Sequence, residues 1–197
     1  MAANPRDEVF DFTKTLVGDD AVGMLSKLLW EMQQIFEYKG DESAIRAFMS
    51  YNAASTAWHI HEWLWKLCPD DQRSNLLEVV NAKTQDFDGY VRGLQLSNGA
   101  IAICRQIATA GKHVGVKYNR DDIAGEIHHD AETGATAVKF KWNDRVVDDL
   151  AVYAEALHVW MRIYVGLGFK EAEKLASVVA EIDGWRAAQQ GATANGE

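Results

Sequence analysis

Apolar residues recur at intervals of three and four along most of this chain, a pattern typical of amphipathic α-helices. Turn-forming residues separate the helical segments, since Gly18, Gly40 and Gly111 favour helix ends and Pro69 cannot continue a helix. The spacing predicts helices over residues 7–17, 21–38, 41 or 43 to 67, 70–84, 99–110, 144–166 and 170–187.

The third of these helices carries large aromatic residues on nearly all of its sides. One face holds Ile45, Phe48, Asn52, Thr56, His59 and Trp63. The opposite face holds Ala54, Trp58, His61 and Trp65. A helix that is apolar all round usually lies in the middle of a bundle. We therefore expect Trp58, Trp63 and Trp65 to be mostly buried.

The apolar period changes between residues 123 and 142. Residues 137–142 alternate strictly between apolar and polar, and residues 132–134 supply a turn. The sequence therefore predicts an all-α protein, a bundle of about six to seven helices with one β-hairpin inserted near 123–142. We expect a single helical domain over residues 1–187, followed by a disordered tail over residues 188–197.

Composition and charge narrow the classes of function. The chain has 197 residues and a net charge of −9, which opposes indiscriminate binding to nucleic acid but still permits a small basic pocket. The two cysteines, Cys68 and Cys104, form neither a disulfide framework nor a CxxC zinc motif. The polar N-terminus and the lack of an apolar run of about 20 residues lead us to expect a soluble, cytoplasmic protein without a membrane segment.

The third predicted helix supplies one candidate site. His59 and Glu62 are three residues apart, so they share a face and could approach one ion or one proton; Asn52 lies on the same side. The alternative is that His59 and Asn52 are buried polar groups with hydrogen-bond partners in the core, which is the usual state of such side chains.

Two further histidine groups invite a metal hypothesis. Glu155 and His158 form a Glu-x-x-His pair, and di-iron bundles use two such pairs with two more glutamates. The chain supplies only one pair in that order, with His59 and Glu62 as a reversed pair, so a solvated His158 is the alternative. The adjacent residues 128 and 129 are both histidines. On a strand they would face opposite ways and could not jointly hold a metal without distortion, so we expect them to be exposed loop residues.

The end of the 99–110 helix carries a third polar group, made of Arg105, Lys112 and His113. An arginine and a histidine at a helix end can bind a phosphate and move its protons, as RNA cleavage requires. The alternative is that these cations only complement the helix dipole. We expect Arg105, Lys112 and His113 to share one polar surface, with His59 or Asn52 nearby.

The segment from Arg105 and Gln106 to His113 resembles the HEPN superfamily of small all-helical domains. Those domains are often dimeric and occur in toxin–antitoxin, abortive-infection and other defence systems. Active members are metal-independent ribonucleases with an Arg, a polar residue, and a His four to six residues after the Arg. Seven residues lie between Arg105 and His113 here, which leaves open a non-catalytic HEPN-like domain.

The combination of TAWHIHEW at residues 56–63 with CRQIATAGKH at residues 104–113 also resembles a group of bacterial helical proteins of uncharacterised function. In that group a TAWH-x-x-(D/E)W helix precedes a CRxxAxxxKH helix and a short β-hairpin. The resemblance covers residues 45–165 and implies no activity.

Three hypotheses follow. The first is a HEPN-like protein that binds RNA, with Arg105 and His113 as catalytic residues of a ribonuclease and Lys112, His59, Glu62 and Asn52 as binding residues. The second is a non-enzymatic module that binds a protein partner in an antitoxin, immunity or anti-defence role. The third is a metal or small-ligand binder. We expect the chain to form a homodimer and to bind no cofactor.

Overall fold

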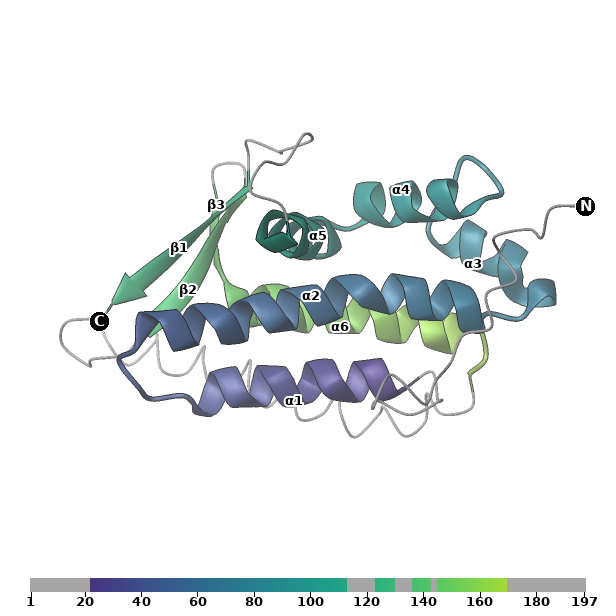
Figure 1. Ribbon diagram of the computed structural model, residues 1–197. Helices are drawn as coiled ribbons and strands as arrows, with labels where there is room; N and C mark the ends of the chain where they lie inside the picture. The colour runs from purple at the N-terminus through teal and green to yellow at the C-terminus, as the bar shows by residue number, and fades with distance from the viewer. Residues whose placement is uncertain (1–21, 113–122, 130–135, 143–144, 170–197) are drawn as a thin grey trace, which may run out of the picture.

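The computed structural model describes residues 22–112, 123–129, 136–142 and 145–169. These residues form six α-helices and one three-stranded sheet (Figure 1). In chain order the elements are α1 (Gly23–Glu37), α2 (Ser43–Leu67), a 3-10 turn (Asp70–Gln72), α3 (Arg73–Val79), α4 (Phe87–Ser97), α5 (Gly99–Lys112), β1 (Ile123–His129), β2 (Thr136–Trp142), β3 (Arg145–Asp148) and α6 (Asp149–Gly166).

The predominance of helix is confirmed, and α1 and α2 lie where the apolar spacing placed them. The predicted helices 7–17 and 170–187 and the predicted tail lie outside the described residues. None of the described helices is long and apolar enough to cross a membrane.

The prediction of a simple hairpin was wrong, because β3 adds a third strand to it. The sheet is antiparallel with the order β1-β2-β3. Residues 145–148 were expected to begin a helix, but α6 begins only at Asp149. The two β-branched residues Val146 and Val147 favour a strand, and Asp148 lies opposite Lys139 of β2, an oppositely charged cross-strand pair.

The helix α4 was not predicted, and α3 is shorter than the segment 70–84. Gly89 and Gly93 weaken the helical pattern of α4. In the fold they let the loop after α3 pack close, since a Cβ at either position would collide with a backbone carbonyl of that loop. The chain leaves α3 through Asn81, whose φ of 55° is left-handed, and Asp86 caps α4 by accepting the Gly89 N–H.

The helix α2 is the centre of the architecture. In Figure 1, α1 and α6 lie alongside it, α5 crosses it, and the sheet and α3 lie at its two ends. Small buried residues let neighbours approach closely: the indole Nε1 of Trp160 on α6 donates to the Ala57 carbonyl at 2.8 Å. Trp58 is buried, whereas Trp63 and Trp65 are half-buried and pack against the core, so the expected burial holds fully for Trp58 alone.

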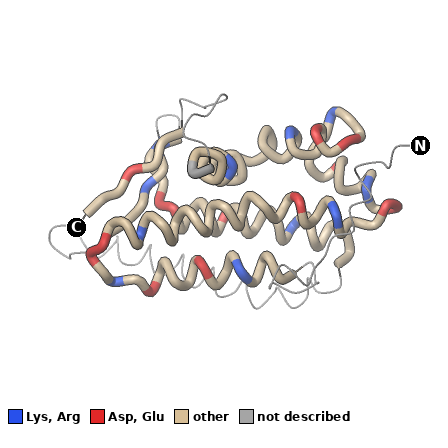
Figure 2. Tube along the Cα trace, viewed as in Figure 1, with Lys and Arg blue, Asp and Glu red and all other residues tan. Residues whose placement is uncertain are grey.

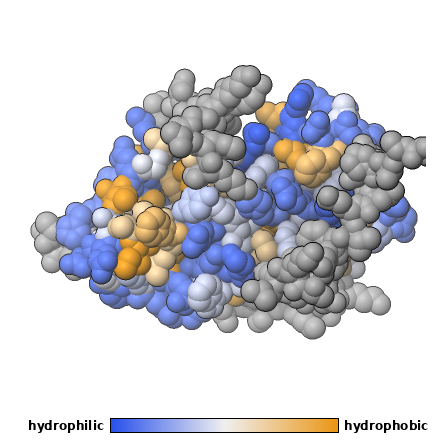
Figure 3. All heavy atoms as spheres, viewed as in Figure 1, coloured by the Kyte–Doolittle hydropathy of each residue, from blue (hydrophilic) through white to orange (hydrophobic). Residues whose placement is uncertain are grey.

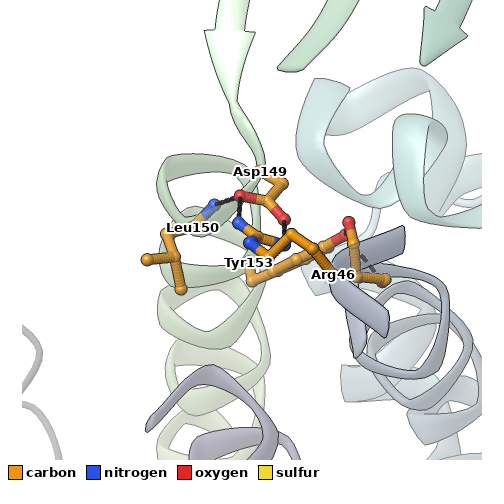
Figure 4. Close-up of polar contacts among 5 residues, drawn as sticks. Arg46, Asp149, Leu150 and Tyr153 are labelled. Carbon is orange, nitrogen blue, oxygen red and sulfur yellow. Dashed lines mark hydrogen bonds and ion pairs between the residues drawn. The ribbon is translucent and has the colours of Figure 1, made fainter. Parts of the chain in front are cut away.

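A buried polar network joins α2 to α6 at their N-terminal ends (Figure 4). Arg46 donates two hydrogen bonds of 2.7 Å to the Asp149 carboxylate, and both side chains are buried. One turn further on, the Tyr153 hydroxyl donates to the Ser50 carbonyl at 2.7 Å and accepts from the Ser50 hydroxyl. Burial raises the pKa of Tyr153, which keeps this hydroxyl protonated.

These contacts also define the direction of the two helices. The pairs Arg46–Asp149, Ser50–Tyr153 and Ala57–Trp160 all differ by 103 residues. A constant difference means that α2 and α6 run parallel, as Figure 1 shows. The side of α2 that faces α6 is therefore occupied, and the sides left for other elements carry the aromatic residues.

Candidate functional site

The candidate site lies where α2, α4 and α5 meet. It brings together Trp58 and His61 of α2, Gln95 of α4 and Arg105 of α5. Trp58, His61 and Trp65 are spaced by three and four residues, so they share one face of α2.

The aromatic rings of this face form a stack with α4. The centroids of the Trp58 and His61 rings are 4.0 Å apart, and those of His61 and Phe87 are 5.7 Å apart in a stacked arrangement. Further along, Trp65 stacks on Tyr90 at 5.3 Å. Such contacts hold α4 against α2 and restrict the movement of the aromatic side chains beside Arg105.

His61 is a neutral, enclosed member of that stack. It is 3% exposed, and its Nδ1–H donates to the Trp58 carbonyl at 2.6 Å. Its Nε2 atom lies 4.0 Å from a carboxylate oxygen of the exposed Glu62. Burial lowers the pKa of His61 to about 4, so the ring carries no charge at neutral pH. Because it is enclosed, we assign it a positioning role and no direct contact with a ligand.

Arg105 is the exposed charged group of the site. Its guanidinium lies over the Trp58 ring, 5.6 Å from the centroid, and donates a hydrogen bond to the side-chain oxygen of Gln95. Partial burial lowers the pKa of Arg105, and it is the single cause of that shift among the described residues. Within the part of the chain that the structure describes, the cation is thus held by two uncharged side chains, with no carboxylate near enough to shift its pKa.

The residues predicted to accompany Arg105 lie elsewhere on α2. Asn52 is exposed, so the interpretation that it is a buried core group was wrong. His59 is half-buried, and its Nδ1 bonds the Ser55 carbonyl at 2.6 Å. Besides burial, the charge of Arg105 contributes to lowering the pKa of His61, which lies on the opposite face of α2 from His59. The reason is that α5 packs against the Trp58 side of α2.

The metal hypothesis gains no support from the geometry. Within the described part of the chain, no three His, Cys, Asp or Glu side chains group so that they could hold a metal ion. That part includes His59, Glu62, Glu155 and His158, of which both glutamates are exposed.

The adjacent histidines of β1 take separate partners. His128 approaches Glu126 at 3.4 Å, whereas His129 lies 3.4 Å from the Thr136 hydroxyl. Both histidines are exposed, as expected, but the prediction that they lie in a loop was wrong, because both belong to β1 and pair with β2.

Of the predicted pair Arg105 and His113, the structure describes only Arg105. The helix α5 continues two residues beyond its predicted end, to Lys112. Lys112 therefore follows Arg105 by two helical turns, about 10 Å along the axis. His113 and the side chain of Lys112 lie outside the described residues. Gln106 is buried while Arg105 is exposed, so these two neighbours do not share one surface.

Trp58, His61 and Gln95 are the site residues that reasoning from the sequence did not select. The spacing of Trp58 and His61 was a usable signal, but it needed a helix to cover that face. No signal selected Gln95, because α4 itself was not predicted.

Comparison of the chain with protein-family models, with curated proteins and with solved structures gave no match.

Proposed function

We propose that the protein binds single-stranded RNA at the surface around Arg105 and cleaves it with Arg105 and His113. The observation that carries the proposal is the state of Arg105: an exposed guanidinium, oriented by Gln95 and Trp58 and, among the described residues, without a carboxylate to neutralise it.

Two other arginines show what a purely structural role looks like in this fold. Arg46 is buried and fully engaged by Asp149. Arg73 lies 4.1 Å above the Trp65 ring and donates to the Cys68 carbonyl at 3.0 Å, with one buried edge. Arg105 differs because its neighbours orient it while leaving its charge available for an anion.

A planar guanidinium suits RNA in two ways. It can donate two parallel hydrogen bonds to a phosphate, and its flat face can stack on an unpaired base. Figure 2 shows acidic and basic positions interspersed along the described helices in this view, without a continuous basic stripe. Such a surface favours a short single-stranded ligand over a long duplex, which would need many phosphate contacts.

The catalytic part of the proposal rests on His113. In the sequence it directly follows Lys112, the last residue of α5. A histidine has an ordinary pKa near the working pH, which suits a general acid or base. Arg105 would neutralise the phosphate while His113 moves its proton.

Fluorescence anisotropy with a labelled single-stranded RNA tests the binding step. Arg105→Ala should weaken binding roughly 10- to 100-fold, the equivalent of one lost charge-assisted hydrogen bond of about 1.5–3 kcal/mol. Arg92→Ala on α4 is the matched control, since Arg92 is also exposed. Equal affinities for wild type and Arg105→Ala would refute the site, and so would the absence of binding by wild type.

Gel assays of RNA degradation test the catalytic step separately. His113→Ala should abolish cleavage while retaining binding and the thermal midpoint. If His113→Ala cleaves as fast as wild type, the assignment of His113 fails. If wild type binds RNA without cleaving it, the protein is a binding domain only.

A non-enzymatic role in binding a protein partner is the second candidate. It is supported by Phe48, a large apolar side chain on α2 that is 67% exposed. Co-purification from the native cell separates the two candidates. If the protein binds a protein partner, the Phe48→Ser variant should lose a partner protein that wild type and Arg105→Ala both retain. Wild type and Arg105→Ala should then not bind RNA.

A further inference from the structure

The strand β1 forms a long open edge of the sheet. It pairs with β2 through all of its seven residues, from Ile123 opposite Trp142 to His129 opposite Thr136, without a bulge. Its other side has no strand beside it within the described part of the chain (Figure 1). Six of its seven residues are exposed.

Within the described part of the chain, this edge has few of the features that usually prevent pairing with another chain, and Glu126 is its one acidic or basic residue apart from the histidines. Natural edge strands are short, bulged, or carry lysine or proline, whereas β1 reads IAGEIHH. Ile127 lies opposite Val138, on the same side of the sheet, yet Ile127 is 50% exposed and Val138 is buried. The opposite edge, β3, has only four residues and leads directly into α6.

We propose that two copies of this chain associate through β1, antiparallel about a two-fold axis at Ile127, and so form one six-stranded sheet. This register sets Ile127 opposite Ile127 of the second copy and covers both apolar side chains. It also sets Glu126 opposite His128 of the second copy, twice, so that a carboxylate faces an imidazole in each direction.

The neighbouring registers are less favourable. An axis at Glu126 would place two carboxylates directly opposite each other, which destabilises a strand pair. A shift of the strand register by one residue would place Ile127 opposite Glu126 of the second copy. Because side chains alternate between the two faces of a strand, the sheet of the second copy would then be turned over relative to the first. The charge pattern of β1 is therefore self-complementary in one register.

The surroundings of β1 are suited to a second copy. Figure 3 shows apolar side chains gathered where the sheet and the N-terminal half of α2 reach the surface. The large exposed apolar residues of β1 and of that part of α2 are Ile127, Phe48 and Ile45. A sheet that continues into a second copy would extend over this area and remove part of it from water.

Light scattering after gel filtration tests the association. Wild type should have about twice the chain mass of 22.0 kDa. Ile127→Lys should be a monomer, because it places two ammonium groups face to face at the axis. Val146→Lys on β3 is the matched control, since Val146 is 59% exposed on the other edge strand, and it should remain a dimer. Circular dichroism checks that each variant is folded.

Cysteine crosslinking tests the register. Cys68 and Cys104 are buried, so a crosslink between two copies comes from the thiol that is introduced at the surface. Under mild oxidation, Ile127→Cys should give a disulfide-linked dimer, whereas Glu126→Cys should not, because its two copies are diagonal neighbours about 7–8 Å apart and too far for a disulfide. A monomeric wild type at all concentrations would overturn the proposal. So would an Ile127→Lys variant that remains a dimer, or crosslinking that is strong at residue 126 and absent at 127.

Discussion

Replacing His61 by Phe should remove a specific part of the pH dependence of stability. His61 is enclosed between Trp58 and Phe87, and burial lowers its pKa to about 4 from an ordinary value near 6.5. Between these values the unfolded chain binds a proton that the folded chain excludes. The free energy of unfolding therefore falls as the pH falls from about 6.5 to 4. At neutral pH the stabilisation is fully present.

The size of the effect follows from the shift. One pKa unit corresponds to 1.36 kcal/mol, so a shift from 6.5 to about 4 makes wild type about 3 kcal/mol less stable at pH 4 than at pH 7 on account of this residue. Phe fills a similar space, keeps the ring stack and does not titrate. The hydrogen bond from His61 to the Trp58 carbonyl is lost at every pH, so it shifts the whole curve.

Urea unfolding of wild type and His61→Phe at pH 7, 6, 5 and 4 measures the difference. Groups that titrate in both proteins cancel when the two curves are subtracted. The variant should gain about 3 kcal/mol relative to wild type over this range. If the difference between the two proteins changes by less than about 0.5 kcal/mol, then His61 is not held neutral in the fold, and the enclosed stack is wrong.

Two further predictions concern packing. Arg46→Met leaves the Asp149 carboxylate buried without a partner and should cost about 3–5 kcal/mol in urea melts. Adding Asp149→Leu should restore most of that loss, and a double variant as unstable as the single one would contradict it. Gly99→Ala places a Cβ against the Trp142 ring and should cost about 1–3 kcal/mol. An unchanged thermal midpoint would show that the Trp142 ring does not pack there.

Much of the helical framework was predictable because local signals marked it. The helices α1 and α2 end at Glu37 and Leu67, a few residues before Gly40 and Pro69, where a change of backbone conformation is expected whatever the tertiary structure. The helix α4 was not predictable in this way. In the sequence, Gly89 and Gly93 are residues that weaken a helix. Only the tertiary structure shows that they leave room for the loop after α3 to pack against α4.

The candidate site was predictable only in part. Arg105 was selected because a cation near a helix end can bind an anion, and the structure leaves that cation exposed. The histidine beside it was misjudged, since His59 and His61 lie on opposite faces of a helix that is apolar or aromatic all round. Periodicity identifies a face only when the other side is polar, and α2 offers no such contrast.

The parallel pairing of α2 and α6 explains why Arg105 is so placed. The bonds from Arg46, Ser50 and Ala57 to α6 commit one side of α2 along most of its length. The rings of Trp58 and His61 then lie on the side of α2 that α4 and α5 cover. The rings and Gln95 supply no negative charge, so the described neighbours of Arg105 orient its guanidinium without neutralising it. In a chain with a net charge of −9, this oriented cation is the feature on which the proposed binding of an anionic ligand rests.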